Sequence, residues 1–421
     1  MTNSARSHDA DFRRTVLPNG LTVLSEHVPG VRSVSFGAWV RAASVHESPS
    51  EMGVSHLLEH MVFKGTARRS AQDIALALEA VGGSLDAYTS REHTVYQARV
   101  LDRHLTLAAD VIGDMVFHPS LRSDDLALER RVVLEEIAMV EDTPDDLVFE
   151  LHNETLWGTH PLGYSILGTR ETVSRLGVRE LRALHERAYH PEHIVVAAAG
   201  NLQHEDLLAA LHETGWADVP RGGTARVITP EPHAEAPTRR HVERDGAQAH
   251  LVLGSPAVAH GDPRRYALAL VSMLMGGGMS SRLFQRVREE LGLAYAVYTF
   301  QSFHATTGVH GVYVGTGPDT AARALEAIEA ELGRVAEEGL PDDELAMGKE
   351  QLKGQLVLSL EGAGSRMYRA AGVELYGEPF RTTDELLAQV DAVDAETVRE
   401  VARTFFAPGR QTVLTLGPGA G

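Results

Sequence analysis

The segment from Met52 to Phe63, MGVSHLLEHMVF, restricts the fold and the chemistry of this chain more than any other stretch. Its apolar residues recur at i, i+3, i+4, i+7 and i+8, which predicts the buried face of an amphipathic helix. Because successive residues of a helix are rotated by about 100°, His56, Glu59 and His60 lie together on the opposite face. The segment therefore predicts a helix that presents two imidazoles and one carboxylate to the same point.

The spacing of these three residues suits a zinc ion. Two histidines at i and i+4 can both reach zinc at about 2.0–2.1 Å, and a neighbouring glutamate can accept a proton from the attacking water. The string from His56 to His60 is an H-x-x-E-H motif, the reverse order of H-E-x-x-H. The chain has no cysteine, so His, Asp or Glu must hold any metal. The alternative is a solvated His/Glu face on a surface helix.

A second helical pattern, over residues 124–142, offers a third ligand. Glu129 and Glu136 are seven residues apart, so they share one face of this helix, whereas Glu135 points to the polar side. The arc around the two carboxylates is expected to be apolar, with Leu126, Val132, Val133, Ile137 and Val140. A buried carboxylate is costly unless it is paired or binds a metal, which makes Glu136 a candidate ligand and Glu129 its supporting residue. The alternative is an ion pair with an Arg or Lys from elsewhere.

Strand-like and helical patterns alternate along the chain, which predicts an α/β or α+β fold. In the first part, strands are expected at 21–28 and 34–43, and helices at 51–65, 70–82, 103–117 and 124–142. A Pro-, Gly- and Ala-rich linker at 218–238 separates residues 1–217 from residues 239–421. The second part repeats the plan, with a strand at 250–257, a helix at 264–276 and a helix leading into a strand at 280–300. A duplicated unit is therefore expected.

Composition excludes several partners. The 39 Lys and Arg residues against 58 Asp and Glu residues give a net charge of -19, which repels nucleic acids and anionic membranes but favours cationic peptides. The N-terminal stretch has no apolar h-region, and no apolar run approaches the roughly 18 residues that span a bilayer. We expect a cytoplasmic protein with no nucleic-acid and no membrane partner.

The stretch GVSHLLEHMVFKGT, followed downstream by LEEIAMVEDTPDD, resembles the M16 family of zinc peptidases, which includes pitrilysin, insulinase and the mitochondrial processing peptidases. This resemblance implies that His56, His60 and Glu136 bind one Zn²⁺ per chain. It also implies that Glu59 is the general base and Glu129 an auxiliary acid.

Two further stretches resemble the substrate-binding segments of the family. GGSLDAYTSREHTVY (82–96) resembles the strand that binds the substrate backbone, with Ala87 at its centre, although Asp86 stands where processing peptidases commonly have Asn. GGGMSSRLFQRVREELGLAYAVYTF (276–300) resembles the segment from which an Arg and a Tyr reach the substrate, here Arg288 and Tyr295. Both side chains can hold peptide carbonyls or a developing oxyanion.

The resemblance also implies the architecture and the activity. The fold would consist of two homologous halves, each a mostly antiparallel sheet flanked by helices, facing each other across a cleft with zinc in the first half only. The expected function is a zinc metalloendopeptidase of the inverzincin type that acts on peptides, as a homodimer or as a heterodimer with a paralogous M16 subunit. The alternatives are a non-catalytic partner or structural subunit of such a complex, and a peptide binder with a structural zinc.

Overall fold

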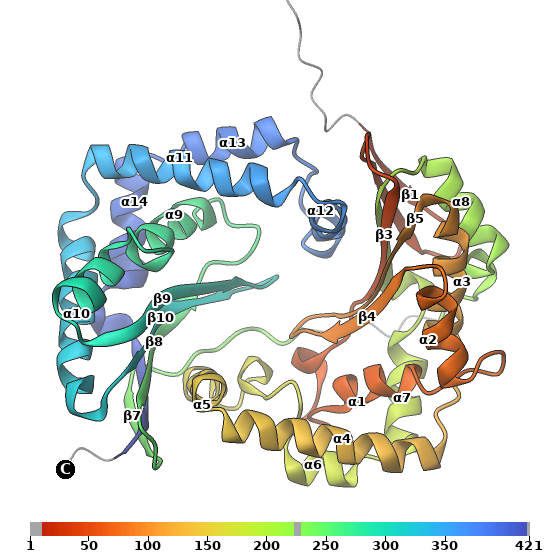
Figure 1. The fold of residues 1–421 in the computed structure, drawn as a ribbon, viewed down its shortest axis with the longest axis horizontal. Coiled ribbons are helices and arrows are strands. Elements are labelled where there is room, and N and C mark those ends of the chain that lie inside the picture. Colours follow the sequence, from red (N-terminus) through yellow and green to blue (C-terminus); the bar gives the residue numbers. More distant parts are fainter. Residues whose placement is uncertain (1–10, 223–228, 419–421) are drawn as a thin grey trace, which may run out of the picture. The chain divides into compact units, whose positions relative to one another are not determined.

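Two units, each built around one β-sheet, make up the fold in a computed structural model that describes residues 11–222 and 229–418 (Figure 1). Unit 1 comprises the chain up to Ala138, Tyr164–Pro230 and Ser359–Thr383. Unit 2 comprises Met139–Gly163, Glu231–Leu358 and the chain from Asp384 onward. The chain therefore passes between the units several times.

Unit 1 contains a six-stranded sheet with the order β1-β2-β6-β3-β5-β4. Its strands are β1 (Phe12–Val16), β2 (Thr22–His27), β3 (Ser33–Val40), β4 (Ser84–Thr89), β5 (Thr94–Leu101) and β6 (Ile194–Gly200). Only β2 and β6 pair in parallel, so the sheet is mostly antiparallel, as expected. Among the described residues, β1 and β4 are its outer strands.

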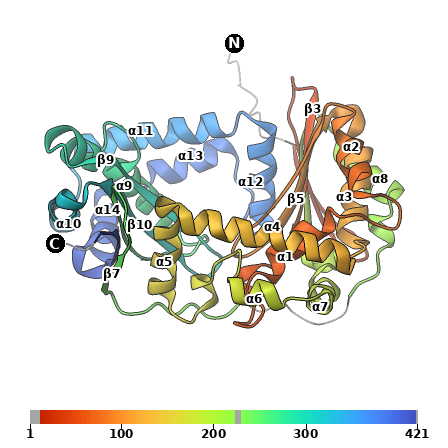
Figure 2. The same cartoon turned by 60° about the horizontal axis from the view of Figure 1, so that its bottom comes forward.

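Helices cover both faces of this sheet. The helices that lie wholly or mostly in unit 1 are α1 (Val54–Val62), α2 (Ala71–Glu79), α3 (Leu105–Phe117), α4 (Ser123–Asp142), α6 (Arg170–Arg175), α7 (Val178–Ala188), α8 (His204–Glu213) and α12 (Ala363–Leu375). Because side chains alternate along a strand, Val196 of β6 joins the core beneath α3 and α8, whereas Val195 joins a second core beneath α12. Figures 1 and 2 show α12 on the face opposite to α3 and α8. Burial on both faces explains why β6 is a continuous apolar run.

Unit 2 contains a five-stranded sheet with the order β7-β11-β8-β10-β9. Its strands are β7 (Arg239–Glu243), β8 (Ala249–Ala257), β9 (Ala294–Phe303), β10 (Gly308–Thr316) and β11 (Thr412–Gly417). Its helices are α5 (Pro144–Trp157), α9 (Arg265–Gly276), α10 (Ala321–Glu338), α11 (Asp342–Ser359), α13 (Thr383–Asp391) and α14 (Ala395–Val401). Helices α9, α10 and α14 pack on one face, and α5 packs on the other through Val148.

The two sheets repeat one strand order. Taken in chain order, the five strands from β2 to β6 are arranged in space as β2-β6-β3-β5-β4, and those from β7 to β11 as β7-β11-β8-β10-β9. The first and last strand of each set pair in parallel. The expected duplication is therefore confirmed at the level of topology, with β1 as an addition to the first copy.

Each sheet is covered on one face by a helix from the other part of the chain. Helix α5 precedes the predicted linker but belongs to unit 2, and α12 follows it but belongs to unit 1. The predicted parts, 1–217 and 239–421, thus contain one copy of the repeated strand order each. They differ from the two structural units because α5 of the first part packs in unit 2 and α12 of the second part packs in unit 1. Within the predicted linker 218–238, residues 219–222 and 229–238 form no helix or strand, and residues 223–228 lie outside the described residues.

The helices and strands expected from the sequence are present in the structure, with small shifts at their ends. Helices expected at 51–65 and 70–82 are the shorter α1 and α2, and the strand expected at 34–43 ends at Val40 in β3. The segment 280–300 contains a π-helical turn, Phe284–Glu290, followed by β9. No helix within residues 11–222 and 229–418 combines the length and hydrophobicity needed to cross a bilayer.

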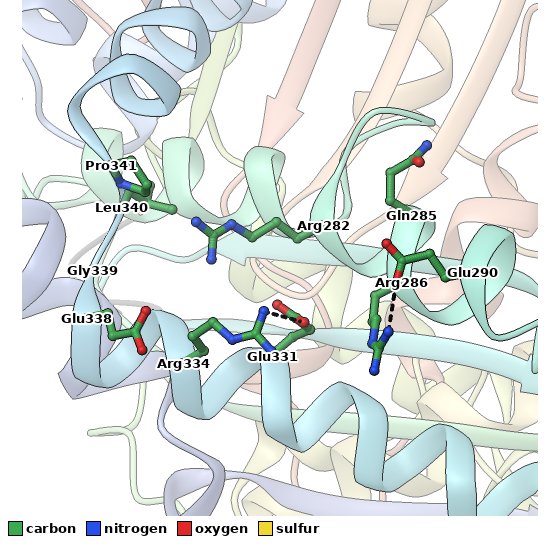
Figure 3. A pocket seen from close by; sticks show the side chains of 10 residues that line it. All are labelled: Arg282, Gln285, Arg286, Glu290, Glu331, Arg334, Glu338, Gly339, Leu340 and Pro341. Atoms are coloured by element: carbon green, nitrogen blue, oxygen red, sulfur yellow. Dashed lines mark hydrogen bonds and ion pairs between the residues drawn. The ribbon is translucent and has the colours of Figure 1, made fainter.

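A cavity of about 730 Å³ lies in unit 2 between the π-helical turn and the C-terminal end of α10 (Figure 3). Each of its three arginines forms an ion pair: Arg282 with Glu344, Arg286 with Glu290, and Arg334 with Glu331. Because these charges are already neutralised inside the unit, the cavity indicates no particular class of ligand.

Candidate metal centre

Helix α1 carries the H-x-x-E-H motif and is anchored by its apolar face. Leu57, Leu58 and Met61 are fully buried in the core of unit 1. The helix starts after Gly53, whose φ of +87° is left-handed and strained for a residue with a Cβ. A Cβ at Gly53 would lie 2.5 Å from the carbonyl oxygen of Leu167, so glycine is required here on two grounds.

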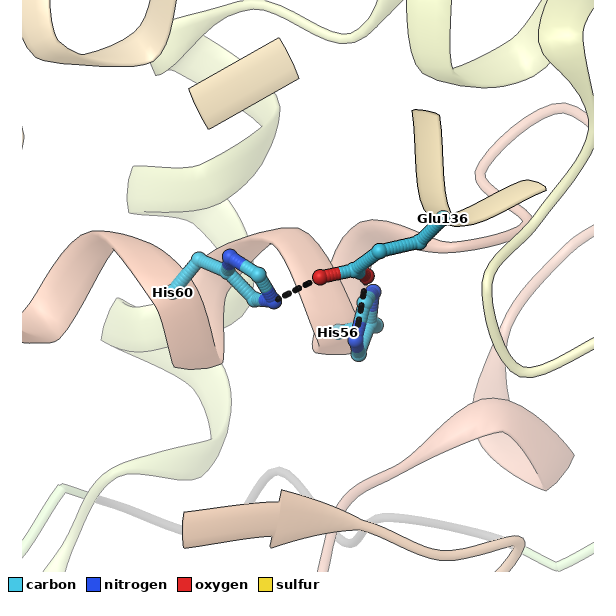
Figure 4. Close-up of side chains that lie close together, drawn as sticks. All are labelled: His56, His60 and Glu136. Carbon is cyan, nitrogen blue, oxygen red and sulfur yellow. Dashed lines mark ion pairs between the residues drawn. The ribbon is translucent and has the colours of Figure 1, made fainter. Parts of the chain in front are cut away.

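The structure brings His56, His60 and Glu136 together. One ligand atom from each lies within 4.8 Å of the others, and no further group of three metal-binding side chains occurs in the described part of the chain. The Nε2 atom of His56 is 3.6 Å from Oε2 of Glu136, and Nε2 of His60 is 3.7 Å from Oε1 (Figure 4). Both imidazoles therefore direct the same nitrogen towards one carboxylate.

The distances from the Glu136 oxygens to the two histidine nitrogens agree better with shared coordination of a zinc ion than with direct hydrogen bonds. A hydrogen bond between nitrogen and oxygen is about 2.7–3.2 Å long, so 3.6 and 3.7 Å are too long. Two ligand atoms on a tetrahedral zinc, each about 2.0–2.1 Å from the ion, are roughly 3.3 Å apart. Two imidazoles and a carboxylate also form the ligand set of known catalytic zinc sites, which leave one position open for water or substrate.

The protonation and orientation of the histidines also suit a metal. Burial, and secondarily the nearby His60, lower the pKa of His56 to about 3, so its imidazole is neutral and has a lone pair to donate. Nδ1 of His60 lies 3.1 Å from Oε2 of Glu129, an arrangement that orients a ligating imidazole. By contrast, Nδ1 of His56 is buried without a hydrogen-bond partner among residues 11–222 and 229–418.

Helix α4 places Glu129 behind the centre and Glu136 in it. The side chain of Glu129 is buried, and its Oε1 is 2.5 Å from Nζ of Lys64. The ion pair with an Arg or Lys that was considered as an alternative to metal binding is therefore found at Glu129, which also contacts His60. The expected apolar arc is wrong at Val132, which is 43% exposed because α4 turns that side to solvent. The expected burial of Glu136 is wrong as well, since 34% of its side chain is exposed. Lys64 was not predicted, since nothing in its spacing distinguishes it from a surface lysine.

Glu59 is buried beside the ligands and has a partner that the sequence did not indicate. Thr89, the last residue of β4, donates a hydrogen bond of 2.5 Å from Oγ1 to Oε2 of Glu59. Burial raises the pKa of Glu59, and the hydrogen bond from Thr89 opposes that rise. The carboxylate is thus held in place and made more basic than an exposed glutamate.

The predicted substrate strand lies next to this group. Ala87 is in β4, which pairs with β5 on one side and is an outer strand of the described sheet. Asp86 precedes it and is exposed. Since Thr89 belongs to the same strand, β4 connects this outer edge of the described sheet to Glu59.

Arg288 and Tyr295 lie together in unit 2. The Arg288 guanidinium carbon is 5.0 Å from the centre of the Tyr295 ring and 4.7 Å from that of Phe284, within the range of cation–π contacts. The Tyr295 side chain is 77% exposed. The π-helical turn thus carries a half-buried arginine that packs against an exposed tyrosine, and their role in substrate binding stays a prediction.

Comparison with known proteins identifies the family. The model of the insulinase family, peptidase family M16, matches residues 22–170, and that of the peptidase M16 inactive domain matches residues 175–352. The chain belongs to the M16 peptidase family. It is 42% identical to an uncharacterized zinc protease of Streptomyces coelicolor over 96% of this chain and 89% of that protein. It is 40% identical to an uncharacterized zinc protease of Bacillus subtilis over 94% of this chain and 96% of that protein.

Two solved structures share the fold. A peptidase M16 inactive domain from Pseudomonas fluorescens aligns with a TM-score of 0.91 over 98% of each chain, at 21% sequence identity. A protease from Helicobacter pylori aligns with a TM-score of 0.92 over 97% of this chain and 99% of that one, at 20% identity. The expected M16 architecture of two homologous parts is thereby confirmed, and the family is one of zinc metallopeptidases.

Proposed function

We propose that this M16 member is a zinc metalloendopeptidase whose single zinc is held by His56, His60 and Glu136. The convergence of these three side chains on one point, with Glu59 buried beside them, carries the proposal. When bound, zinc supplies a Lewis acid that polarises the scissile carbonyl and makes water acidic enough to act as a nucleophile near neutral pH.

Proton transfer in this mechanism is assigned to Glu59. Glu59 accepts a proton from the attacking water and transfers it to the leaving amine. Burial favours this role, because it raises the pKa of Glu59 towards the operating pH of a general base. Thr89 engages Oε2, so Oε1 is the oxygen that receives the proton.

The substrate in this proposal is an extended peptide. β4 offers an outer strand on which a peptide can add by main-chain hydrogen bonds, centred on Ala87. In unit 2, Arg288 and Tyr295 are the candidates for binding peptide carbonyl oxygens, since a guanidinium and a phenol both donate hydrogen bonds. The net charge of -19 favours basic peptides.

The test measures zinc content and hydrolysis of a quenched fluorescent peptide, with and without o-phenanthroline. We expect one zinc per chain, chelator-sensitive cleavage, and loss of cleavage with retained zinc in Glu59→Gln. Glu136→Gln should lose zinc, whereas Glu135→Gln, at the exposed neighbouring position, should match the wild type. Bound zinc without cleavage of any peptide would instead support the non-catalytic subunit, and absence of zinc would refute the site.

A further inference from the structure

Glu47 is a buried carboxylate outside the metal centre that binds the start of α1. Its Oε2 accepts a hydrogen bond from the amide of Gly53 and its Oε1 accepts one from the amide of Ser55, each 2.8 Å long. Only 5% of the residue is exposed. The first N–H groups of a helix have no partner within the helix, and Gly53 has no side chain with which to cap them. A carboxylate six residues upstream takes that role.

The turn that leads into Glu47 is held by the segment that connects β4 and β5. A 3-10 turn, Ser44–His46, follows β3 and ends at Glu47. The amide of Val45 in this turn donates a 2.8 Å hydrogen bond to the carbonyl of Arg91, and Val45 is buried. Burial raises the pKa of Glu47 to about 7, and the amides of Ser55 and Gly53 counteract that rise. The carboxylate is therefore desolvated and depends on α1 for its hydrogen bonds.

The two histidines of the centre differ in what orients them. His60 is held through Nδ1 by Glu129, whereas Nδ1 of His56 has no partner among the described residues. No hydrogen bond at Nδ1 orients His56, so its direction depends on the packing around its buried ring and on the backbone of the first turn of α1. That turn contains Ser55, whose amide is bound by Glu47.

We propose that Glu47 is a positioning residue for the metal centre, which fixes the first turn of α1 and thereby the direction in which His56 projects. The inference rests on the proposed zinc site. For His60 the corresponding function belongs to Glu129, so the two ligands of one helix are oriented by two different carboxylates, one through the backbone and one through the imidazole.

The test uses Glu47→Gln, which keeps the shape of the side chain but replaces one acceptor oxygen by an NH₂ group that cannot accept a hydrogen bond from an amide. Zinc affinity is measured by competition with a chelating dye, and the melting temperature is measured on the zinc-free protein. Asp73→Asn is the matched control, because Asp73 caps α2, a helix of the same unit without metal ligands.

We expect Glu47→Gln to bind zinc about 10–100-fold more weakly than the wild type, as is typical when a group that supports a metal ligand is lost. The zinc-free variant should stay folded, with a melting transition as cooperative as that of the wild type, and Asp73→Asn should keep its zinc affinity within twofold of the wild type. A zinc affinity of Glu47→Gln equal to that of the wild type would overturn the proposal. A wild type that binds no zinc would refute the proposed function itself, so the two failures are distinguishable.

A second measurement needs no variant. In zinc-free wild-type protein, residue-resolved hydrogen exchange should show the amides of Gly53 and Ser55 protected to the level of the α1 interior. Exchange as fast as that of an exposed loop would contradict the cap and with it the role of Glu47.

Discussion

Thr89 at the end of β4 donates a hydrogen bond to the carboxylate of Glu59 in α1. The pair connects an outer strand of the sheet to the helix that carries the H-x-x-E-H motif. A peptide that adds to β4 would therefore lie on the same strand that holds the proposed general base. In the proposed mechanism, this contact would couple peptide binding to proton transfer.

Removal of this hydroxyl should slow peptide cleavage. We expect Thr89→Val to lower kcat/KM by at least about tenfold, because a hydrogen bond to a charged group contributes about 1.5–3 kcal/mol. Thr89→Ser keeps the donor and should stay within threefold of the wild type. Steady-state hydrolysis of the quenched peptide decides this, and equal rates for the Val and Ser variants would exclude a role of the hydroxyl.

Loss of the carboxylate behind His60 should weaken zinc binding. In Glu129→Gln the oxygen that faces Nδ1 of His60 loses its charge, and we expect zinc affinity to fall about 10–100-fold. Glu135→Gln, on the exposed side of the same helix, serves as the control. If chelator competition gives the same affinity for both variants, Glu129 does not orient His60.

Unit 2 should lose stability in mild acid because of His310. Burial lowers the pKa of this histidine from its ordinary 6.5 to about 4, and its Nε2 contacts the carbonyl of Phe405 at 2.8 Å. Between pH 6.5 and 4 the unfolded chain binds a proton that the folded chain excludes, so stability falls as the pH falls through this window. At pH 5 the loss is about 2 kcal/mol relative to pH 7.5.

Urea unfolding of wild type and His310→Gln at both pH values tests this. The difference in unfolding free energy between pH 7.5 and pH 5 should be about 2 kcal/mol smaller in the variant, whatever its absolute stability. An unchanged difference would show that His310 does not contribute to acid sensitivity.

Gly53 should tolerate no side chain. Gly30 has the same φ of +87° but no atom within 4 Å of an added Cβ, whereas a Cβ at Gly53 meets the carbonyl of Leu167. We expect Gly30→Ala to cost about 1 kcal/mol from backbone strain alone. Gly53→Ala should cost clearly more and should also weaken zinc binding, because the start of α1 must shift. Equal thermal destabilisation of the two variants would contradict this contact.

Local periodicity predicted much of the site. His56, Glu59 and His60 share one face of any α-helix because of their spacing. The apolar residues of α1 determine that the opposite face packs in the core. Glu136 could be found for the same reason, as a carboxylate on the partly apolar face of α4. The assignment failed at Val132, since a helical pattern shows which residues share a face but not how wide the buried part of that face is.

Glu129 was predicted as a supporting residue, but two other supporting residues could not be found in this way. Thr89 contacts α1 from a strand, and Glu47 contacts it from a turn. A threonine in a strand or a glutamate in a turn is common on protein surfaces, so the sequence alone does not show that these two side chains bond to α1. The sequence also did not predict on which sheet α5 and α12 pack. An amphipathic pattern shows that a helix must bury one face, but it does not show which sheet covers that face. The expected dimer stays a prediction.

The exchange of α5 and α12 has a practical consequence for anyone who cuts the chain. A fragment that ends at residue 217 would lack α12 and would expose the apolar surface that Met367, Ala370 and Ala371 cover on β2, β3 and β6. A fragment that starts at residue 239 would lack α5 and would leave Val252 and Leu414 bare. We expect neither piece to fold on its own, so a chain divided at the linker should fold only if both pieces are produced together and reassemble.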